Sequence, residues 1–290
     1  MIDLHLHSNN SDGLDTPSQL INKAIELNLK AIALTDHDTI TGLREFLSYG
    51  EDKDLIVIPG VEFSIQDEPN RELIDIHIIG LNIDADSTKL INSIQDQLKG
   101  RLEQKKAICS RLRNEFGYVI TFEEVRELAV NNLVGRPHIV EIMKKNNPSM
   151  TQGKSKNDLF KMISVGGEAF VERTTELNFE DSIDLIKAVG GISILAHPGI
   201  HDISNHIRFI EFCVNVGLEG IEVEYPYAKN RPYYNTDKAK WAQEYFPSYF
   251  RKIAEKYNLK KSGGSDYHGG EKGIEIGEAH VPDRYLKNFI

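Results

Sequence analysis

The chain has 290 residues, of which 40% are hydrophobic and 27% are charged, and its formal net charge is −10 at pH 7. This length and composition are typical of a globular protein with one barrel, or with one core domain and an insert. The acidic balance argues against a protein that follows long duplex nucleic acid, because such proteins carry a basic face.

The cysteines and the apolar runs indicate where such a protein resides. Cys109 and Cys213 are far apart and form no C-x-x-C pair, so we expect reduced thiols in the cytoplasm. No run approaches the ~18 apolar residues of a membrane span, and no basic and apolar leader precedes the first strand. We therefore expect a cytoplasmic protein that does not bind a membrane. The oligomeric state stays open.

Residues 2–6 have the alternation of a strand, with apolar side chains at 2, 4 and 6. His5 and His7 therefore leave the same face. The polar stretch 8–13 reads as a loop that can bring Asp12 back toward both histidines. A solvated or hydrogen-bonded pair also explains this motif, because chance alone gives about 0.3 His-x-His pairs in a chain of this composition.

Strand and helix patterns then alternate along the chain. We expect helices at 17–28 and 39–48 and strands at 31–35, 55–58 and 73–79, the first helix being capped by Thr16 and Pro17. Such alternation predicts parallel strands joined by helical crossovers.

The pattern changes after residue 87. Apolar residues follow helical spacing from 87 to 116, and helical or loop signals continue to about 169. We therefore predict a helical insert at 99–170 between two parts of a barrel, 1–98 and 171–290. Six basic residues of the long helix could guide an anion, although a solvated face explains them more simply: Lys99, Arg101, Lys105, Lys106, Arg111 and Arg113.

Alternation resumes in the last third of the chain. We expect strands at 192–196, 220–224 and 261–265 and helices at 179–189, 203–216 and 236–257. The sequence thus predicts an α/β barrel of seven strands.

Nine potential ligands lie at the strand ends or on the same strand faces. They are His5, His7, Asp12, His37, Glu62, His77, His197, Asp266 and His268. The carboxyl ends of parallel strands converge, so these groups can meet. Each histidine alone reads as a buried, hydrogen-bonded ring, but nine groups without a thiolate predict two or three divalent ions. Mn²⁺ fits this ligand set best, with Fe²⁺ or Zn²⁺ as alternatives.

Six motifs carry a resemblance to a known family. They are D-L-H-L-H-S-N-N-S-D-G, A-L-T-D-H-D-T, G-V-E-F-S, I-H-I-I-G, L-A-H-P-G and G-G-S-D-Y-H-G. In this order they resemble the PHP (polymerase and histidinol phosphatase) family of metal-dependent phosphoesterases. The resemblance implies a distorted seven-stranded β/α barrel with a trinuclear site. It implies one ion on His5, His7, Glu62 and Asp266, a second on Glu62, His77 and His197, and a third on Asp12, His37 and His268.

The predicted insert contains Gly135-Arg136-Pro137-His138 before an apolar helical run. Proline fits the first turn of a helix, and the arginine fork suits phosphate oxygens. From spacing alone, an exposed helix start is the simpler explanation of the motif. The motif also resembles the branch of the family that removes the 3′-phosphate of nucleoside 3′,5′-bisphosphates or trims 5′-phosphorylated oligoribonucleotides. That resemblance implies that Arg136 and His138 contact substrate phosphate.

Two regions depart from the family pattern. The sequence has Glu222-Val-Glu-Tyr-Pro226 where relatives more often show a tyrosine and a histidine before the proline. Tyr225, Tyr227, Tyr233 and Tyr234 could stack on a base, although packing explains most of them. His201, His206 and His280 match no motif and read as surface or structural residues.

The predicted reaction is hydrolysis of a phosphomonoester. Two ions sharing Glu62 would hold a hydroxide for attack on phosphorus, while the third ion, Arg136 and His138 would bind phosphate oxygens. The group that protonates the leaving oxygen is not identified. Alternatives are a histidinol-phosphate or sugar-phosphate phosphatase, a hydrolase of C–N bonds, and a non-catalytic metal-holding accessory domain. The last is disfavoured because all nine ligand positions are filled.

Overall fold

The computed structural model describes residues 1–129, 134–270 and 273–290. The chain divides into two compact units, Met1–Asn92 with Leu177–Ile290, and Ser93–Glu176. The sequence predicted an insert at 99–170, which lies inside the second unit. Each unit is described by itself below.

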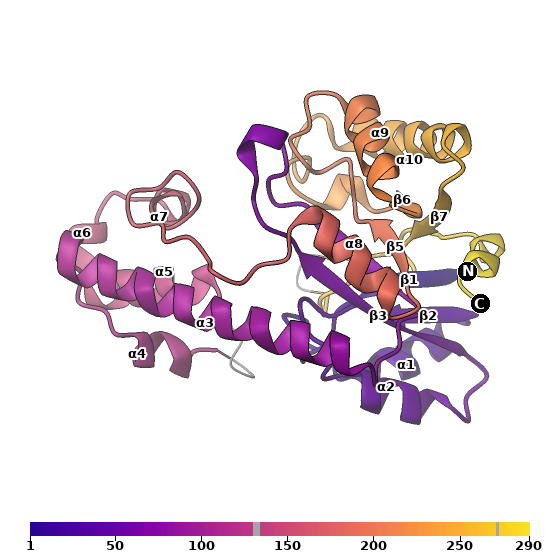
Figure 1. Ribbon diagram of the computed structural model, residues 1–290, viewed down its shortest axis with the longest axis horizontal. Helices are drawn as coiled ribbons and strands as arrows, with labels where there is room; N and C mark the ends of the chain where they lie inside the picture. The colour runs from indigo at the N-terminus through magenta and orange to yellow at the C-terminus, as the bar shows by residue number, and fades with distance from the viewer. Residues whose placement is uncertain (130–133, 271–272) are drawn as a thin grey trace. The chain divides into compact units, whose positions relative to one another are not determined.

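The first unit is built on a seven-stranded sheet whose strands follow one another in chain order (Figure 1). The strands are β1 (Ile2–Leu6), β2 (Ala31–Leu34), β3 (Ile56–Ser64), β4 (His77–Leu81), β5 (Ile192–Leu195), β6 (Gly220–Glu224) and β7 (Lys260–Gly263). The residues after β7 return to β1, since the His7 amide donates to Tyr267 O at 3.0 Å and the Asp266 amide donates to His5 O at 3.0 Å. The sheet is thus a nearly closed barrel, which confirms the predicted fold class.

The strands are not all parallel, so that part of the prediction was wrong. β1, β2 and β3 pair in parallel, as do β5, β6 and β7, but β4 is antiparallel to both β3 and β5. Only the short 3-10 helix η1 (Pro69–Arg71) lies between β3 and β4, whereas parallel strands need a long, usually helical crossover. As a result the first residue of β4, His77, pairs with Ser64 at the end of β3.

Strand β1 contains a bulge that simple alternation does not predict. Its register with β2 shifts between Asp3 and Leu6. Ile2 and Leu4 belong to a buried cluster with side chains from β2 to β5 and from the C-terminal segment 281–289. His5 lies next to Leu4 but faces the polar site instead. In a regular strand the adjacent residues Leu4 and His5 point to opposite faces. Because a bulge re-aims side chains, β1 supplies both apolar residues to the core and histidines to the site.

Helices connect most of these strands. They are α1 (Pro17–Glu26), α2 (Leu43–Gly50), α8 (Phe179–Ala188), α9 (His206–Val216) and α10 (Ala239–Lys256), with the 3-10 helices η3 (Tyr227–Lys229) and η4 (Asp283–Asn288). Thr16 and Gln19 form the capping box of α1, as expected from the sequence. Helix α2 begins at Leu43 instead of 39, after a loop in which Asp38 has a left-handed backbone with φ of 50°.

The second unit is helical. Helix α3 (Thr88–Phe116) begins in the first unit and is followed by α4 (Phe122–Glu127), α5 (Arg136–Asn146), α6 (Pro148–Thr151) and α7 (Lys156–Met162). Ile108 and Leu112 of α3 pack with Ile139 and Met143 of α5 in a core of its own. Among the described residues, no helix combines the length and apolar character that crossing a membrane requires.

Candidate metal centre

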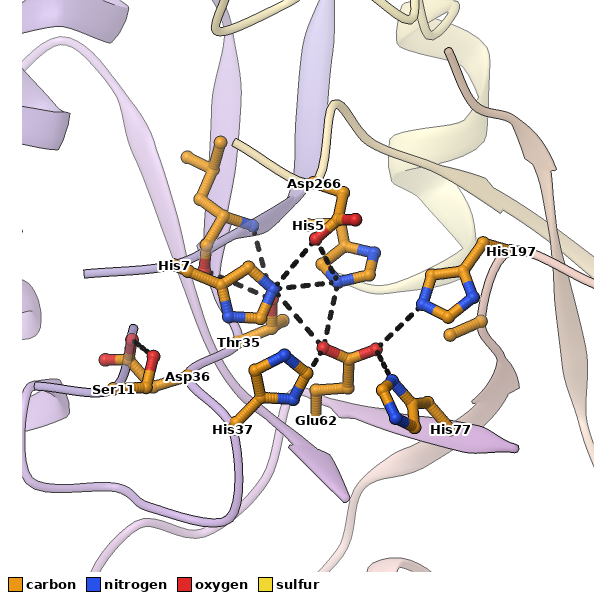
Figure 2. A network of polar contacts seen from close by, with 12 residues as sticks. His5, His7, Ser11, Thr35, Asp36, His37, Glu62, His77, His197 and Asp266 are labelled. Atoms are coloured by element: carbon orange, nitrogen blue, oxygen red, sulfur yellow. Dashed lines mark hydrogen bonds and ion pairs between the residues drawn. The ribbon is translucent and has the colours of Figure 1, made fainter. Parts of the chain in front are cut away.

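The barrel brings the nine predicted ligands to one end of the sheet, where eight of them form three overlapping groups of donor atoms and His197 contacts Glu62. Eight of these side chains lie at the C-terminal ends of β1, β2, β3, β5 and β7 or in the loops that follow those strands. The ninth, His77, is the first residue of β4. Figure 2 shows the imidazoles of His7, His37 and His77 around the carboxylate of Glu62. Among the described residues the groups are His5, His7, Glu62 and Asp266; His37, Glu62 and His77; and His7, Asp12, His37 and His268.

The first group is buried and tightly gathered. His5 Nε2 lies 3.1 Å from His7 Nε2, and each nitrogen lies 3.2 Å from Glu62 Oε2. Asp266 Oδ1 lies 3.1 Å from His7 Nε2 and 3.5 Å from His5 Nε2. Donor atoms bound to one ion at about 2.1 Å lie about 3.0–3.4 Å apart. These four side chains therefore fit the ligand set of a divalent cation.

Glu222 supports this group from behind, and the sequence did not identify that role. Glu222 Oε1 accepts a hydrogen bond from His5 Nδ1 at 3.1 Å, and its Oε2 accepts one from the His197 amide at 2.8 Å. If Nδ1 carries the proton of His5, Nε2 presents a lone pair to the site. Carboxylate–histidine pairs of this kind are typical behind metal ligands.

Glu62 lies at the centre and uses both oxygens. Oε1 lies 2.9 Å from His77 Nδ1 and 3.1 Å from His197 Nε2, while Oε2 lies 3.1 Å from His37 Nδ1. With Oε2 also facing His5 and His7, one carboxylate connects two sets of nitrogen donors. That arrangement suits a bridge between two cations.

The third group opens toward solvent at Asp12, whose side chain is 59% exposed. His268 Nδ1 donates a hydrogen bond to the Asp266 carbonyl at 2.8 Å, so Nε2 has a lone pair in the neutral ring. That atom lies 3.2 Å from Asp12 Oδ1, where two lone pairs would face each other. A cation between them resolves the conflict. His37 Nε2 lies farther away, 4.0 Å from Asp12 Oδ2.

The pKa shifts show how strongly these groups interact. Burial acts to raise the pKa of Glu62, but the charges of His37, His5 and His77 hold it well below its usual range. Burial acts to lower the pKa of His7, yet its hydrogen bonds with Asp266 and Glu62 raise it to about 10. The carboxylates thus stay ionised and require positive charge beside them. Protons or metal ions can supply that charge.

The backbone directs two of the ligands. His197 and Asp266 follow β5 and β7, and both have a left-handed backbone, with φ of 29° and 55°. Non-glycine residues rarely adopt this region, and such strain concentrates at functional sites.

The loop that carries Asp12 is held by another carboxylate, that of Asp36. It accepts hydrogen bonds of 2.6 Å from the hydroxyls of Ser8 and Ser11.

The structure revises the sequence-based interpretation of two neighbouring residues. Tyr225 is buried and donates a hydrogen bond to Asp266 Oδ2 at 2.8 Å, so it is not available to stack on a base. The His201 ring centroid lies 5.1 Å from that of His197, which places it beside the site.

The role of Glu222 could have been suspected from the sequence of β6. This apolar strand carries acidic residues at alternate positions, and a carboxylate in a buried strand needs a partner.

Arg136 and His138 belong to the second unit, near the start of α5. Arg136 Nη1 donates to Ser164 Oγ at 3.0 Å, and His138 Nδ1 accepts from the Gly135 amide at 3.0 Å. His138 therefore keeps its proton on Nε2 when neutral, as a hydrogen-bond donor. Pro137 occupies the first turn, as the sequence predicted.

Comparison with known proteins identifies the family. The PHP domain matches residues 3–118. A 5′-3′ exoribonuclease of Salmonella typhimurium is 31% identical, covering 95% of this chain and 87% of the relative. A phosphoribosyl 1,2-cyclic phosphate 1,2-diphosphodiesterase of Eggerthella lenta is 30% identical, covering 92% and 94%. A 3′,5′-nucleoside bisphosphate phosphatase of Chromobacterium violaceum is 28% identical, covering 97% and 92%.

A solved structure agrees with the fold. The protein of Bifidobacterium adolescentis, provisionally named a metal-dependent phosphoesterase, superimposes with a TM-score of 0.73 at 24% identity. The match covers 99% of this chain and 94% of the other. Together with the relatives, which match nearly the whole length, these findings show that the chain is a hydrolase and belongs to the PHP domain family.

Proposed function

We propose that this protein is a metal-dependent phosphoesterase that removes the 3′-phosphate of nucleoside 3′,5′-bisphosphates. The observation that carries the proposal is the gathering of four donor atoms from His5, His7, Glu62 and Asp266 within 3.5 Å of their neighbours. The names of the relatives support a phosphorylated substrate of nucleotide type. Short 5′-phosphorylated oligoribonucleotides are the second candidate, because relatives of similar identity are exoribonucleases.

The proposed metal ligands are the nine clustered side chains. His5, His7, Glu62 and Asp266 would hold one ion, Glu62 with His77 and His197 a second, and Asp12 with His37 and His268 a third. Divalent ions, Mn²⁺ in our proposal, supply Lewis acidity toward phosphate oxygens and lower the pKa of water.

The remaining chemistry falls to the chain itself. Glu222 and Tyr225 orient His5 and Asp266 through their hydrogen bonds, which keeps the donor atoms in place. Arg136 and His138 donate hydrogen bonds to phosphate oxygens in our proposal, as a planar fork and a single N–H. The cytoplasmic location expected from the two reduced cysteines stays a prediction.

A phosphate-release screen tests the proposal. Purified protein loaded with Mn²⁺ is given adenosine 3′,5′-bisphosphate, histidinol phosphate, an aryl phosphate and a 5′-phosphorylated oligoribonucleotide, with and without excess chelator. We expect the bisphosphate to have the highest kcat/KM and chelation to abolish turnover. Preference for histidinol phosphate would favour the sugar-phosphate alternative. No release from any substrate would favour the non-catalytic accessory role.

A further inference from the structure

Helix α10 (Figure 1) carries three aromatic side chains on one side, at the surface of the first unit. Trp241, Tyr245 and Tyr249 are spaced four residues apart, so they are neighbours along the helix. The ring centroids of the first two lie 4.9 Å apart and those of the last two 5.3 Å apart, with 15° between the ring planes in both pairs. Trp241 is 49% exposed and Tyr245 is 42% exposed. The helix thus presents a stacked column of rings to solvent.

Lysines accompany the rings on the same side of the helix. At 3.6 residues per turn, positions 238, 241, 245, 249, 252 and 256 fall within an arc of about 80°. Lys238, Lys252 and Lys256 therefore flank the column, and all three are exposed. The two carboxylates of α10, Glu244 and Glu255, fall outside this arc. We refer to the six residues in the arc as the α10 face.

Neighbouring carboxylates leave most of the charge of the α10 face unbalanced. Among the described residues, none pairs with Lys238 or Lys252. Lys256 Nζ donates to the Tyr257 hydroxyl at 2.6 Å and lies 3.9 Å from the exposed carboxylate of Glu211. The chain as a whole has a formal net charge of −10, so this cationic stripe stands out against an acidic protein. Its charge is complementary to a polyanion.

One end of the α10 face adjoins the metal centre. The Trp241 ring centroid lies 6.3 Å from that of Tyr233, whose hydroxyl donates a hydrogen bond to Gly199 O at 3.0 Å. Gly199 follows the proposed ligand His197 by two residues. The face extends from there along the helix for about 27 Å, at 1.5 Å per residue. A chain molecule bound at the metal centre can therefore continue onto it.

We propose that the α10 face binds the nucleotides of a single-stranded oligoribonucleotide that lie beyond those held at the metal centre. Proteins hold single strands by stacking bases on aromatic rings while a positive surface follows the phosphates, and the α10 face combines both. The proposal rests on the second candidate substrate of the proposed function, but binding to the face requires no turnover.

Two other occupants fit the α10 face less well. A helix that lies on a membrane keeps its lysines on the polar side, opposite the apolar one, whereas here the lysines lie among the rings. A second copy of the chain, paired about a two-fold axis, would bring this face against itself and lysine against lysine. A single strand meets neither difficulty.

The emission of Trp241 tests the proposal directly, because the chain has one tryptophan. Full-length, chelator-treated protein is titrated at low salt with a 5′-phosphorylated oligoadenylate of six nucleotides and, separately, with adenosine 3′,5′-bisphosphate. We expect the oligoadenylate to quench the emission and the bisphosphate, which carries a single base, to leave it unchanged. No quenching by the oligoadenylate, or equal quenching by both ligands, would overturn the proposal.

Two variants test the two kinds of contact, with the affinity for labelled oligoadenylate measured by anisotropy. Tyr245→Ala should raise Kd at least ~5-fold, because one stacking partner of the bases is lost. Lys252→Gln should reduce the slope of log affinity against log salt by about 0.7, the value for one phosphate contact on a single strand. Lys240→Gln is the matched control, because Lys240 is exposed on the same helix but lies outside the arc.

The control variant should bind oligoadenylate within about twofold of wild type and keep its salt slope. An unchanged Kd in Tyr245→Ala, or equal slopes in Lys252→Gln and Lys240→Gln, would contradict the proposal, provided that thermal unfolding shows all three variants to be folded. Binding of wild type to phosphatidylserine vesicles that oligoadenylate does not displace would assign the α10 face to a membrane instead. Hydrolysis of an aryl phosphate by Mn²⁺-loaded wild type reports on the proposed function alone.

Discussion

His5 Nε2 and His7 Nε2 lie 3.1 Å apart, and both face the same oxygen of Glu62. Without protons these two rings would direct lone pairs at each other and at a carboxylate. The arrangement is therefore stable only with positive charge at its centre. A metal ion accepts the lone pairs of both nitrogens and of the carboxylate oxygen. Because Glu62 faces both rings, we expect the site to depend on this residue.

Replacing Glu62 by glutamine should remove metal from the protein. The amide keeps the shape of the side chain but loses the charge that faces five histidines. We expect the metal content per chain, measured by mass spectrometry, to fall by at least one ion, and turnover to fall at least ~100-fold. Glu26→Gln, on the exposed side of α1, is the control. An unchanged metal content in Glu62→Gln would refute the bridging assignment.

Glu222→Gln should weaken metal binding without abolishing it. The variant loses the charged acceptor of the His5 Nδ1 hydrogen bond, so the ring is less basic and less firmly oriented. Loss of such a partner costs about 10–100-fold in metal affinity. Activity titrated with Mn²⁺ should therefore recover at higher metal concentration, and calorimetry should report the weaker affinity. A loss that saturating Mn²⁺ does not relieve would argue for a different role.

Arg136→Ala should affect substrates unequally. If Arg136 binds a phosphate that an aryl phosphate lacks, its loss removes a charge-assisted hydrogen bond worth about 1.5–3 kcal/mol. KM for adenosine 3′,5′-bisphosphate should rise at least ~10-fold, while kcat/KM for the aryl phosphate stays within about twofold. Arg113→Ala, exposed on α3, serves as the control. Equal losses for both substrates would remove Arg136 from recognition.

The stability of Lys105→Met relative to wild type should depend on pH. The pKa of Lys105 is about 7 in the folded protein, against its usual 10.5. Below pH 7 the folded wild type carries the full cost of a buried, repelled charge. That cost shrinks as pH rises from 7 to 10.5 and then vanishes. Thermal unfolding from pH 6 to pH 10, in a buffer without phosphate, should show the advantage of the variant decreasing; a constant difference would contradict the shift.

The gathering of the proposed ligands was predictable because most of them lie near the end of an apolar strand or just after it, in a short, distinctive motif. Asp36-His37-Asp38 after β2 and Asp266-Tyr267-His268 after β7 are examples, and the barrel does bring His37 and His268 to one group. The seven strands followed from the same apolar runs. Short sequence patterns therefore predicted where the strands end and which polar side chains lie there.

Other features depend on contacts that a linear pattern does not contain. The reversal of β4 depends on the connection after β3, and the bulge in β1 depends on its register with β2. Glu222 looked like a departure from a motif, because nothing in the sequence shows which face of β6 meets His5. The pairing of Arg173 with Gln97 likewise joins segments 76 residues apart.

The antiparallel pairing of β3 and β4 also bears on the order of folding. Glu62 and His77 are 15 residues apart and meet across a hairpin, whereas Glu62 and His197 are 135 residues apart. Local contacts form early, and distant ones wait for loop closure. During synthesis the emerging hairpin presents a carboxylate and an imidazole as an incomplete chelate. His197, Asp266 and His268 are made only after the whole helical unit, so the complete set of donors exists only in the finished barrel.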